Sequence, residues 1–250
     1  MTNIILTGAC GKMGKVIQSV VDARENCNIV AGVDKYNDNL SPFPVYSSLR
    51  EVKEEADVII DFSNPSLLDE LLDYATKNNT ALVIATTGFD ECQKKKIVDS
   101  SKQCPIFFTY NMSIGINLLA SLAKKAVAVL GNDFDIEIIE QHHNQKIDAP
   151  SGTALMLADA ISEEFDKPMK YEYDRHSKRE KRTKDEIGIH SIRGGTIVGE
   201  HSILFAGRDE NITLSHSARS KEVFAVGAVN AAQFMCGKTP GMYDMGELVK

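Results

Sequence analysis

The stretch Asn-Ile-Ile-Leu-Thr-Gly-Ala-Cys-Gly-Lys-Met-Gly, residues 3–14, joins a short apolar run to three closely spaced glycines. The run ends at Gly8, and apolar residues at helical spacing follow Lys12. A glycine-rich turn between a buried strand and a helix is typical of dinucleotide-binding folds, because free backbone N–H groups there meet a pyrophosphate. In such a turn Gly11 lets the backbone approach the phosphates, and Gly14 lets the helix pack closely on the sheet. The spacing GxxGxxG departs from the usual GxGxxG, so the turn alone leaves a purely structural role open.

Asp34 supports the dinucleotide interpretation from the end of the next predicted strand, residues 28–34. It lies 20 residues after Gly14, where an acidic side chain accepts hydrogen bonds from the adenosine ribose. An aspartate that merely forms a turn is the alternative. Lys35 follows directly and suits a 2′-phosphate, so the sequence favours neither NADH nor NADPH.

Strands and helices alternate through the first half of the chain. Further strands are predicted at 56–62, 80–85 and 105–109, and helices at 12–23, 67–78 and 91–101. Short apolar strands that alternate with helices of this length indicate an α/β fold with a Rossmann-type, doubly wound parallel sheet.

The pattern changes after Asn111. The elements predicted next are a long apolar helix at 115–130, a strand at 134–141, a helix at 152–165 and strands at 186–193, 196–205 and 211–218. Glycine-containing turns after Arg193 and at 207–211 predict hairpins between the last three strands. This part is predicted to be an α+β domain with an antiparallel or mixed sheet. An alanine-rich helix at 222–236 is expected to return to the first domain, which places the domains at 1–110 with 221–250 and at 111–220.

The composition is that of an ordinary globular protein, with 43% hydrophobic and 25% charged residues. A formal net charge of −7 argues against nucleic acid or an anionic membrane as a partner. The N-terminus lacks the regions of a signal peptide, and no apolar run is expected to reach the roughly 20 residues of a membrane helix. Five scattered cysteines without a CxxC pair indicate reduced thiols. A cytoplasmic protein is expected.

The stretch 170–186 is rich in charges of both signs. A solvated, mobile loop is the simpler interpretation. A lid, or a set of cations that attracts a dianionic substrate, is the alternative.

The densest group of chemically active side chains lies between His142 and Thr153. Ser151 is placed to cap a helix whose first turn offers the N–H groups of Gly152 and Thr153 to an anion. Lys146 adds a positive charge, and a histidine with a pKa of about 6.5 donates a proton near neutral pH. A plain helix cap is the alternative for the Ser-Gly-Thr turn.

The other histidine patterns predict no metal site. Adjacent strand residues such as His142 and His143 point to opposite faces, and no third ligand follows at motif spacing. His190, His201 and His216 lie on separate predicted strands, where a core or interface histidine is the simpler interpretation.

Two further segments follow predicted strands at the edge where open α/β sheets bind ligands. Ala85, Thr86 and Thr87 come after the fourth strand, and their hydroxyl groups suit a nicotinamide amide or a substrate carboxylate. An ordinary strand-to-helix turn is the alternative. The segment 109–112 follows the fifth strand and is expected beside the same crevice.

Six ordered blocks resemble the dihydrodipicolinate reductase family over essentially the whole chain. The most specific is EQHHNQKIDAPSGTAL, residues 140–155, which is similar to the family signature E-x-HHxxKxDAPSGTA. The other blocks are GACGKMG, ATTGF, NMSIGIN, IGIHSIRGGTIVGEH and GMYDMGEL. Ala85 replaces a common glycine, and Cys10 stands where a glycine or another small residue is common. Both departures bear on cofactor affinity more than on activity.

The resemblance implies a role for individual residues of these blocks. His142 is implied as the proton donor, Lys146 as a second essential donor and His143 as a substrate contact. The implied contacts of the substrate carboxylates are Thr87, Ser151, Gly152 and Thr153. The implied cofactor contacts are Gly8, Ala9, Cys10, Gly11, Lys12, Met13, Asp34, Lys35, Ala85, Thr86, Thr87, Thr109, Tyr110, Asn111 and Met112.

The resemblance also implies an activity and an assembly. The family reduces 4-hydroxy-tetrahydrodipicolinate, a small cyclic dicarboxylate, to tetrahydrodipicolinate with NADH or NADPH, in the diaminopimelate route of lysine biosynthesis. Its members are homotetramers joined through the second domain, which makes that domain the substrate-binding and oligomerisation domain here. The alternatives are another two-domain NAD(P)-dependent reductase of amino-acid metabolism and a non-catalytic NAD(H) sensor. The cluster of His142, His143 and Lys146 argues against a sensor, which needs no proton donors.

Overall fold

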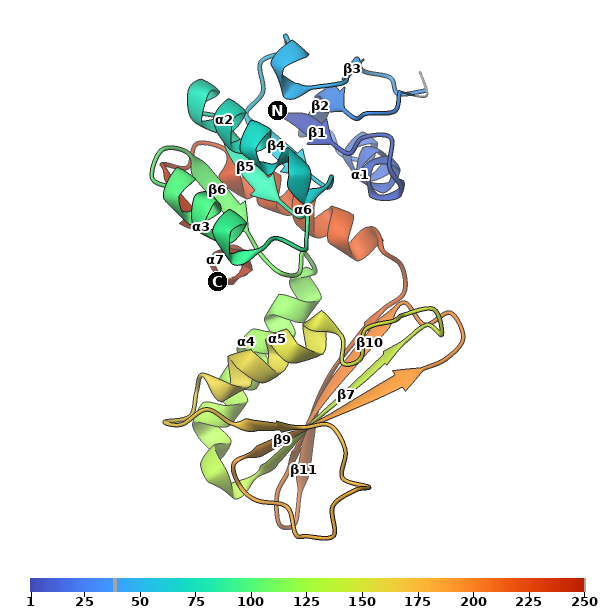
Figure 1. Ribbon diagram of the computed structural model, residues 1–250, viewed down its shortest axis with the longest axis vertical. Helices are drawn as coiled ribbons and strands as arrows, with labels where there is room; N and C mark the ends of the chain where they lie inside the picture. The colour runs from blue at the N-terminus through green and yellow to red at the C-terminus, as the bar shows by residue number, and fades with distance from the viewer. Residues whose placement is uncertain (38–39, 250) are drawn as a thin grey trace. The chain divides into compact units, whose positions relative to one another are not determined.

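The computed structural model describes residues 1–37 and 40–249, which form two compact units (Figure 1). The first unit comprises Met1–Ile114 and Glu222–Lys250, and the second comprises Gly115–Lys221. Each unit has a sheet and a hydrophobic core of its own, so each is described by itself.

A parallel sheet forms the centre of the first unit, with the described strands in the order β12-β6-β5-β4-β1-β2-β3. Its strands are β1 (Thr2–Thr7), β2 (Cys27–Val33), β3 (Val45–Tyr46), β4 (Val58–Asp61), β5 (Ala81–Ile84), β6 (Pro105–Phe108) and β12 (Gly241–Tyr243). Its helices are α1 (Lys12–Asp22), α2 (Leu68–Asn78), α3 (Glu91–Ser100), α6 (Glu222–Met235) and α7 (Met245–Leu248), with the 3-10 turns η1 (Leu49–Glu51) and η2 (Pro65–Leu67). The strand order reverses between β1 and β4, which confirms the predicted Rossmann-type topology and places a ligand crevice at their carboxyl ends.

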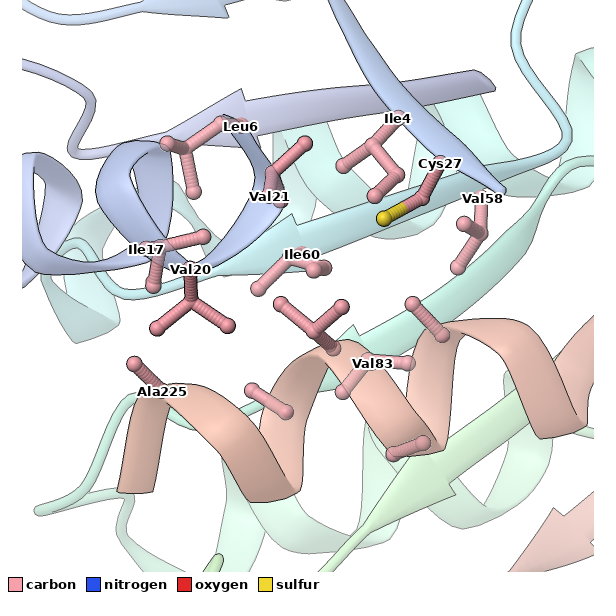
Figure 2. Packing of buried hydrophobic residues seen from close by; sticks show 14 of the residues in the cluster. Ile4, Leu6, Ile17, Val20, Val21, Cys27, Val58, Ile60, Val83 and Ala225 are labelled. Atoms are coloured by element: carbon pink, nitrogen blue, oxygen red, sulfur yellow. The ribbon is translucent and has the colours of Figure 1, made fainter. Parts of the chain in front are cut away.

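Alternating side chains of the strands supply two cores, one on each face of this sheet. Ile4 and Leu6 pack with α1 and α6, while Ile5 between them packs with α2 and α3. Figure 2 shows the first core, in which Ile17 and Val20 of α1 meet the strands and α6. A fully buried Ile or Leu contributes about 1.5–3 kcal/mol, so burial on both faces fixes the strand ends that carry the glycine turn.

Helix α6 belongs to the first unit, although it follows the second unit in sequence. Its buried positions include Ala225, Ala228 and Ala232, and small side chains let the helix approach the sheet closely. At Gly227 a Cβ atom would overlap the carbonyl oxygen of Met112. The alanine-rich composition of this helix therefore reflects close packing.

The second unit is built on a mixed sheet, with the described strands in the order β11-β10-β7-β9-β8. Its elements are α4 (Ile114–Leu130), the 3-10 turn η3 (Gly131–Asp133), β7 (Asp135–His142), α5 (Gly152–Ser162), β8 (Lys170–Glu172), β9 (Glu186–Arg193), β10 (Gly199–Ala206) and β11 (Asn211–Ala218). Strands β7, β8 and β9 run parallel to one another, and β10 is antiparallel to both β7 and β11. Helices α4 and α5 contribute to one core with alternate residues of β7, β9 and β10.

One of the two predicted hairpins is wrong. Strands β10 and β11 do form the hairpin expected around 207–211, with Ala206 opposite Asn211. Strands β9 and β10 do not pair, because β7 lies between them. The turn after Arg193 instead bonds to the end of β7, since Gly194 donates its N–H to the carbonyl oxygen of His142 at 2.9 Å. A turn signal in the sequence does not reveal that a strand from earlier in the chain lies between the two strands that the turn connects.

The apolar helix α4 continues into the 3-10 turn η3. Together they span Ile114–Asp133, 20 residues, which is long and apolar enough, by length and composition alone, to cross a membrane. The expectation that no segment reaches this length is therefore wrong. A single helix of this kind is weak evidence for a membrane span, because core helices pass the same test. Leu119 and Ala123 on its buried side belong to the core of the second unit.

The charged stretch 170–186 is extensively paired. Lys170 forms an ion pair with Asp185 at 2.8 Å, and Arg175 one with Glu186 at 2.7 Å. Arg182 reaches β7 and contacts Asp135 and Glu137 at 2.9 and 3.1 Å. These cations are therefore bound to carboxylates of their own unit, and β8 begins within the same stretch.

Candidate active site

At one end of the second sheet, the buried rows of side chains change from apolar to polar. Along β7 these positions are Ile136, Ile138, Glu140 and His142. Along β10, in the opposite direction, they are Phe205, Ile203, His201 and Gly199. Helix α5 begins at the same end of the sheet: the backbone N–H of its N-cap residue Ser151 donates a hydrogen bond to Glu140. The polar end of the sheet and the helix start thus form one cluster.

Glu140 is the fully buried centre of this cluster. Arg193 donates to its two oxygens at 2.8 and 2.7 Å, and the backbone N–H of Ser151 donates to Oε1 at 3.1 Å. Burial alone raises the pKa of a carboxyl group, but the hydrogen bonds, that from Arg193 first, outweigh burial and hold the pKa of Glu140 at about 2. Glu140 is therefore a carboxylate at neutral pH.

That carboxylate orients His142, whose Nδ1 lies 2.6 Å from Oε2 of Glu140. Because Glu140 accepts the hydrogen on Nδ1, Nε2 is the ring atom left for chemistry. Burial lowers the pKa of His142, and the charge and hydrogen bond of Glu140 only partly oppose this effect. The nearby charges of Lys146 and Arg193 lower the pKa further. His142 is consequently neutral near pH 7, and an added negative charge beside it favours the imidazolium.

Lys146 follows on the loop between β7 and α5. Its Nζ lies 2.8 Å from an oxygen of Asp148, and its backbone N–H donates to the carbonyl oxygen of His143 at 3.1 Å. The ammonium group is close enough to His142 to act on its pKa. The loop thus brings a positive charge to the side of the imidazole.

The start of α5 is formed as its sequence predicts. Ser151 caps the helix, because its hydroxyl oxygen accepts the backbone N–H of Ala154 at 3.2 Å. Gly152 is exposed, and no atom outside its own helix turn and chain neighbours lies within 4 Å of the position that a Cβ atom would take. The first turn of α5 is therefore open to an anion that seeks backbone N–H groups.

In the first unit, Gly8 makes the sharp turn after β1 with a positive φ of 73°. A Cβ atom there would also overlap the carbonyl oxygen of Phe62, so only glycine fits. Gly11 is the N-cap of α1 and supplies no side-chain cap to its first N–H groups. A Cβ atom at Gly14 would overlap backbone oxygens of Gly8 and Ala9, which accounts for the third glycine.

Asp34 lies at the end of β2 and holds the glycine turn directly. Its carboxylate accepts the backbone N–H of Cys10 at 3.0 Å and that of Tyr36 at 3.1 Å. Lys35 beside it is exposed. Asp34 is thus a turn-forming residue as well as a candidate ribose ligand, so the two interpretations left open by the sequence are compatible.

A buried carboxyl group, Asp61, links the strand ends at the point where the strand order reverses. The hydroxyl groups of Thr7 and Ser63 each donate to its Oδ1 at 2.5 Å. Thr86 accepts the backbone N–H of Ser63 at 2.8 Å. Burial raises the pKa of Asp61 despite these hydrogen bonds. The network joins the ends of β1 and β4 to the segment after β5.

Two of the cavities lined by described residues of the first unit lie near the strand ends. One, of about 250 Å³, is lined by residues that follow β5 and β6, namely Thr86, Thr87, Gly88, Phe89, Lys94, Phe108, Thr109 and Tyr110. The other, of about 650 Å³, adjoins η1 and α2 and reaches Ala56 and Thr80, next to the amino ends of β4 and β5. Only the smaller cavity lies at the carboxyl edge where open α/β sheets bind ligands.

The structure brings part of the predicted residues together. In the first unit Cys10 and Asp34 meet at the glycine turn, and Thr86, Thr87, Thr109 and Tyr110 line one cavity; in the second unit His142, Lys146 and Ser151 lie around Glu140. The structure also adds residues to which the sequence assigned no role: Glu140, Arg193, Gly199 and His201 around His142, and Asp61 in the first unit. A signal for Glu140 was present, since it lies on the predicted strand 134–141 two residues before His142, and residues two apart share a face where a strand continues. Arg193 and His201 carried no such signal, because their contact with this group depends on the strand order.

Models of two family domains match almost the whole chain. The model described as dihydrodipicolinate reductase, N-terminus, matches residues 2–112, and that described as dihydrodipicolinate reductase, C-terminus, matches residues 115–249.

Curated relatives agree with these matches. The chain is 53% identical over 250 residues to 4-hydroxy-tetrahydrodipicolinate reductase of Caldanaerobacter subterraneus subsp. tengcongensis, with 100% of this chain and 99% of the relative covered. It is 48% identical over 250 residues to the reductase of the same name from Clostridium novyi, again with 100% and 99% covered.

A solved structure is similar as well. Dipicolinate-bound dihydrodipicolinate reductase from Paenisporosarcina sp. TG-14 superposes with a TM-score of 0.81 at 28% identity, covering 98% of this chain and 97% of that one. A probable dehydrogenase from Thermotoga maritima, with a TM-score of 0.65 at 12% identity and 99% and 92% covered, shares the fold. On the domain models and the full-length identities together, this chain belongs to the dihydrodipicolinate reductase family.

Proposed function

We propose that this chain reduces 4-hydroxy-tetrahydrodipicolinate to tetrahydrodipicolinate with NADH or NADPH, with loss of the 4-hydroxyl group as water, in the diaminopimelate route of lysine biosynthesis. Full-length relatives named for this reaction support the proposal. The observation that carries it is the buried Glu140–His142 pair beside the open start of α5, which provides a proton donor next to an anion site.

The first unit is proposed to bind the dinucleotide. The start of α1, where Gly11 supplies no side-chain cap, offers backbone N–H groups to a pyrophosphate, and Asp34 offers carboxylate oxygens just after β2. The contacts proposed here are Gly8, Ala9, Cys10, Gly11, Lys12, Met13, Asp34, Lys35, Ala85, Thr86, Thr87, Thr109, Tyr110, Asn111 and Met112. Bound reduced nicotinamide supplies the hydride for the reduction.

The second unit is proposed to hold the substrate. A cyclic dicarboxylate brings two negative charges, and the first turn of α5 offers N–H groups of Gly152 and Thr153 to one of its carboxylates. Lys146 adds a positive charge, and His143 and Ser151 add polar contacts. Dipicolinate, the ligand of the related reductase from Paenisporosarcina sp. TG-14, has two carboxylates and supports a dicarboxylate substrate here. Thr87 of the first unit is proposed as a further substrate contact.

His142 is proposed to donate the proton. Its pKa is lowered in the free protein, so a bound dianion has to raise this pKa before Nε2 carries a hydrogen. Glu140 makes that change favourable, because it stabilises the positive ring through Nδ1. Lys146 assists from the neighbouring loop. The substrate thus charges the acid that protonates it.

A cytoplasmic homotetramer, assembled through the second unit, completes the proposal. Helices α4 and α5 pack on one face of its sheet, and the other face carries half-buried Ile139 and Leu204 and, at 46% exposure, Ile192. Apolar side chains on an open sheet face favour burial against another sheet. Light scattering on the purified protein tests the assembly: four times the chain mass of 27.5 kDa supports it, and a monomer contradicts it.

The reaction is tested by the loss of absorbance of reduced nicotinamide, with freshly made synthase product as substrate and NADH and NADPH in parallel. Oxidation that requires this substrate is expected, and the two kcat/KM values give the cofactor preference. No oxidation with either cofactor, by protein that binds NADH and is folded, would overturn the assigned reaction.

A further inference from the structure

His201 on β10 has no part in the reaction as described, yet it lies at the centre of the cluster. It is 4% exposed, and its ring centroid stands 5.2 Å from that of His142 in an edge-to-face arrangement. Across the sheet it faces Glu140 on β7 and His216 on β11. Its Nε2 lies 3.2 Å from the hydroxyl oxygen of Ser151. An apolar side chain would pack equally well at this place, and burial of a polar ring costs free energy. A role beyond packing is therefore expected for His201.

The hydrogen bonds of Ser151 show what this contact does. Its backbone N–H is taken by Glu140, and its hydroxyl oxygen already accepts the N–H of Ala154. A hydroxyl group has two acceptor lone pairs and one hydrogen. If His201 donates to the remaining lone pair, both lone pairs are occupied. The hydroxyl hydrogen is then the only group that Ser151 has left to offer.

The other ring nitrogen of His201 decides the direction of this hydrogen bond. Nδ1 is buried and has no hydrogen-bond partner among the described residues. Burial, together with the nearby charge of His142, lowers the pKa of His201 to about 4, so the ring is neutral and carries one hydrogen. A buried N–H without an acceptor is rare and costly. The hydrogen therefore belongs on Nε2, where Ser151 accepts it, and Nδ1 is left as a bare lone pair.

We infer that His201 is a positioning residue that turns the Ser151 hydroxyl into a hydrogen-bond donor aimed at a substrate carboxylate. This inference rests on the proposed function, in which Ser151 borders the carboxylate site at the start of α5. A carboxylate only accepts hydrogen bonds. When both lone pairs of the serine hydroxyl already accept hydrogen bonds, the hydroxyl can approach the carboxylate only with its hydrogen, and so avoids repulsion between the two oxygens. A serine hydroxyl that rotates freely loses this rotational freedom when it binds the carboxylate, and the lost entropy weakens binding.

A double-mutant cycle with dipicolinate as the probe tests this role. His201→Leu is expected to weaken dipicolinate binding about 10- to 100-fold in the wild-type background, the size of a hydrogen bond to a charged group. In a Ser151→Ala background the same substitution should weaken it less than about 2-fold, because the affected hydroxyl is gone. His201→Gln, whose amide nitrogen can donate to Ser151, should retain most of the affinity. Equal losses in both backgrounds would overturn the inference.

His216→Leu is the matched control. His216 lies opposite His201 on the neighbouring strand, and its Nδ1 is likewise buried without a partner among the described residues. The ring nitrogen that contacts the Ser151 hydroxyl belongs to His201, so substitution of His216 should leave dipicolinate affinity within about 2-fold. A loss as large as that of His201→Leu would mean that the packing of His201 against His216, and not the contact with Ser151, sets the affinity for dipicolinate.

The tautomer is tested without substrate by ¹⁵N NMR of the imidazole rings in the complete wild-type protein. The signals missing from His201→Gln assign His201. The inference requires hydrogen on Nε2 and none on Nδ1, and hydrogen on Nδ1 would overturn it. Because this reading needs no turnover, it remains decisive if the protein fails to reduce the proposed substrate, and so separates failure of the inference from failure of the proposed function.

Discussion

Gly199 on β10 lies against the imidazole of His142 on β7, so that a Cβ atom at Gly199 would stand 3.1 Å from Nε2. Contacts this short force a neighbour to shift. The ladder pair Glu200–Gln141 brings the two strands together at this point. A side chain at Gly199 would thus press on the reactive nitrogen of His142, which would have to move by a few tenths of an ångström.

Gly199→Ala should therefore lower kcat by about 10- to 100-fold, since a misplaced catalytic group costs rate on this scale. The melting temperature should fall only slightly, because the substitution lies at a strand end. Gly194→Ala is the control: it lies in the same turn region, and no neighbouring atom would come within 4 Å of its Cβ. Equal effects of the two substitutions on kcat would contradict this role of Gly199.

Arg193→Met should destabilise the protein by about 3–5 kcal/mol, because it leaves the carboxylate of Glu140 buried without its cation. Adding Glu140→Gln to this variant should restore part of the loss, since no charge is then stranded. Urea unfolding of the two variants and the wild type measures both effects. If the double variant is less stable than Arg193→Met, the buried charge is not the cause.

The depressed pKa of Glu140 also predicts how stability depends on pH. Its folded-state pKa of about 2 is below the ordinary value of 4.5, so its contribution is complete above about pH 5 and is lost as the pH falls toward 2. Glu140→Gln should flatten the fall in unfolding free energy over this window. A wild-type stability that does not fall below pH 5 would show that the folded state does not hold the pKa of Glu140 below its unfolded value.

Binding of dipicolinate should take up protons near pH 7. The pKa of His142 is lowered in the free protein, and a nearby dianion raises it, so the bound state holds more protons over the interval between the two values. Affinity should accordingly increase as the pH falls through that interval. Calorimetry in two buffers of different ionisation enthalpy counts the protons. An uptake that persists unchanged in His142→Gln would assign it to another group.

Asp34→Ala should weaken NADH binding about 5- to 10-fold, because the N–H of Cys10 loses its acceptor and the ribose loses a carboxylate. NADPH should lose less, since removal of the negative charge also removes repulsion of its 2′-phosphate. Fluorescence titration with each nucleotide measures the change. Asp22→Ala, at an exposed position at the end of α1, should leave both affinities unaltered. An equal loss for the two nucleotides would exclude the electrostatic part of this account.

Much of the fold was predictable because its signals are local. The Gly8 turn, the buried strands around it and the cap at Ser151 each follow from residues close in sequence, and the structure has them at the expected places. Strands of two or three residues, such as Val45–Tyr46 and Gly241–Tyr243, were missed. They are too short for a periodic pattern and form only through their neighbours in the sheet.

The residues around His142 were predictable only in part. The loop from His142 to Ser151 is continuous in sequence, whereas Arg193 and His201 reach it through sheet pairing. The false hairpin after Arg193 shows the limit: a turn signal does not say which strand lies next to which. Contacts that depend on strand order and on the direction of buried hydrogen bonds require the three-dimensional structure.

If His142 protonates the substrate, His142→Gln should lower kcat measured at saturating substrate and cofactor. The expected fall is about 10²- to 10⁴-fold, the usual contribution of a general acid, with a much smaller change in KM. NADH affinity should stay at the wild-type value, which shows that the first unit is intact. An unaltered kcat would remove His142 from the mechanism and contradict the account.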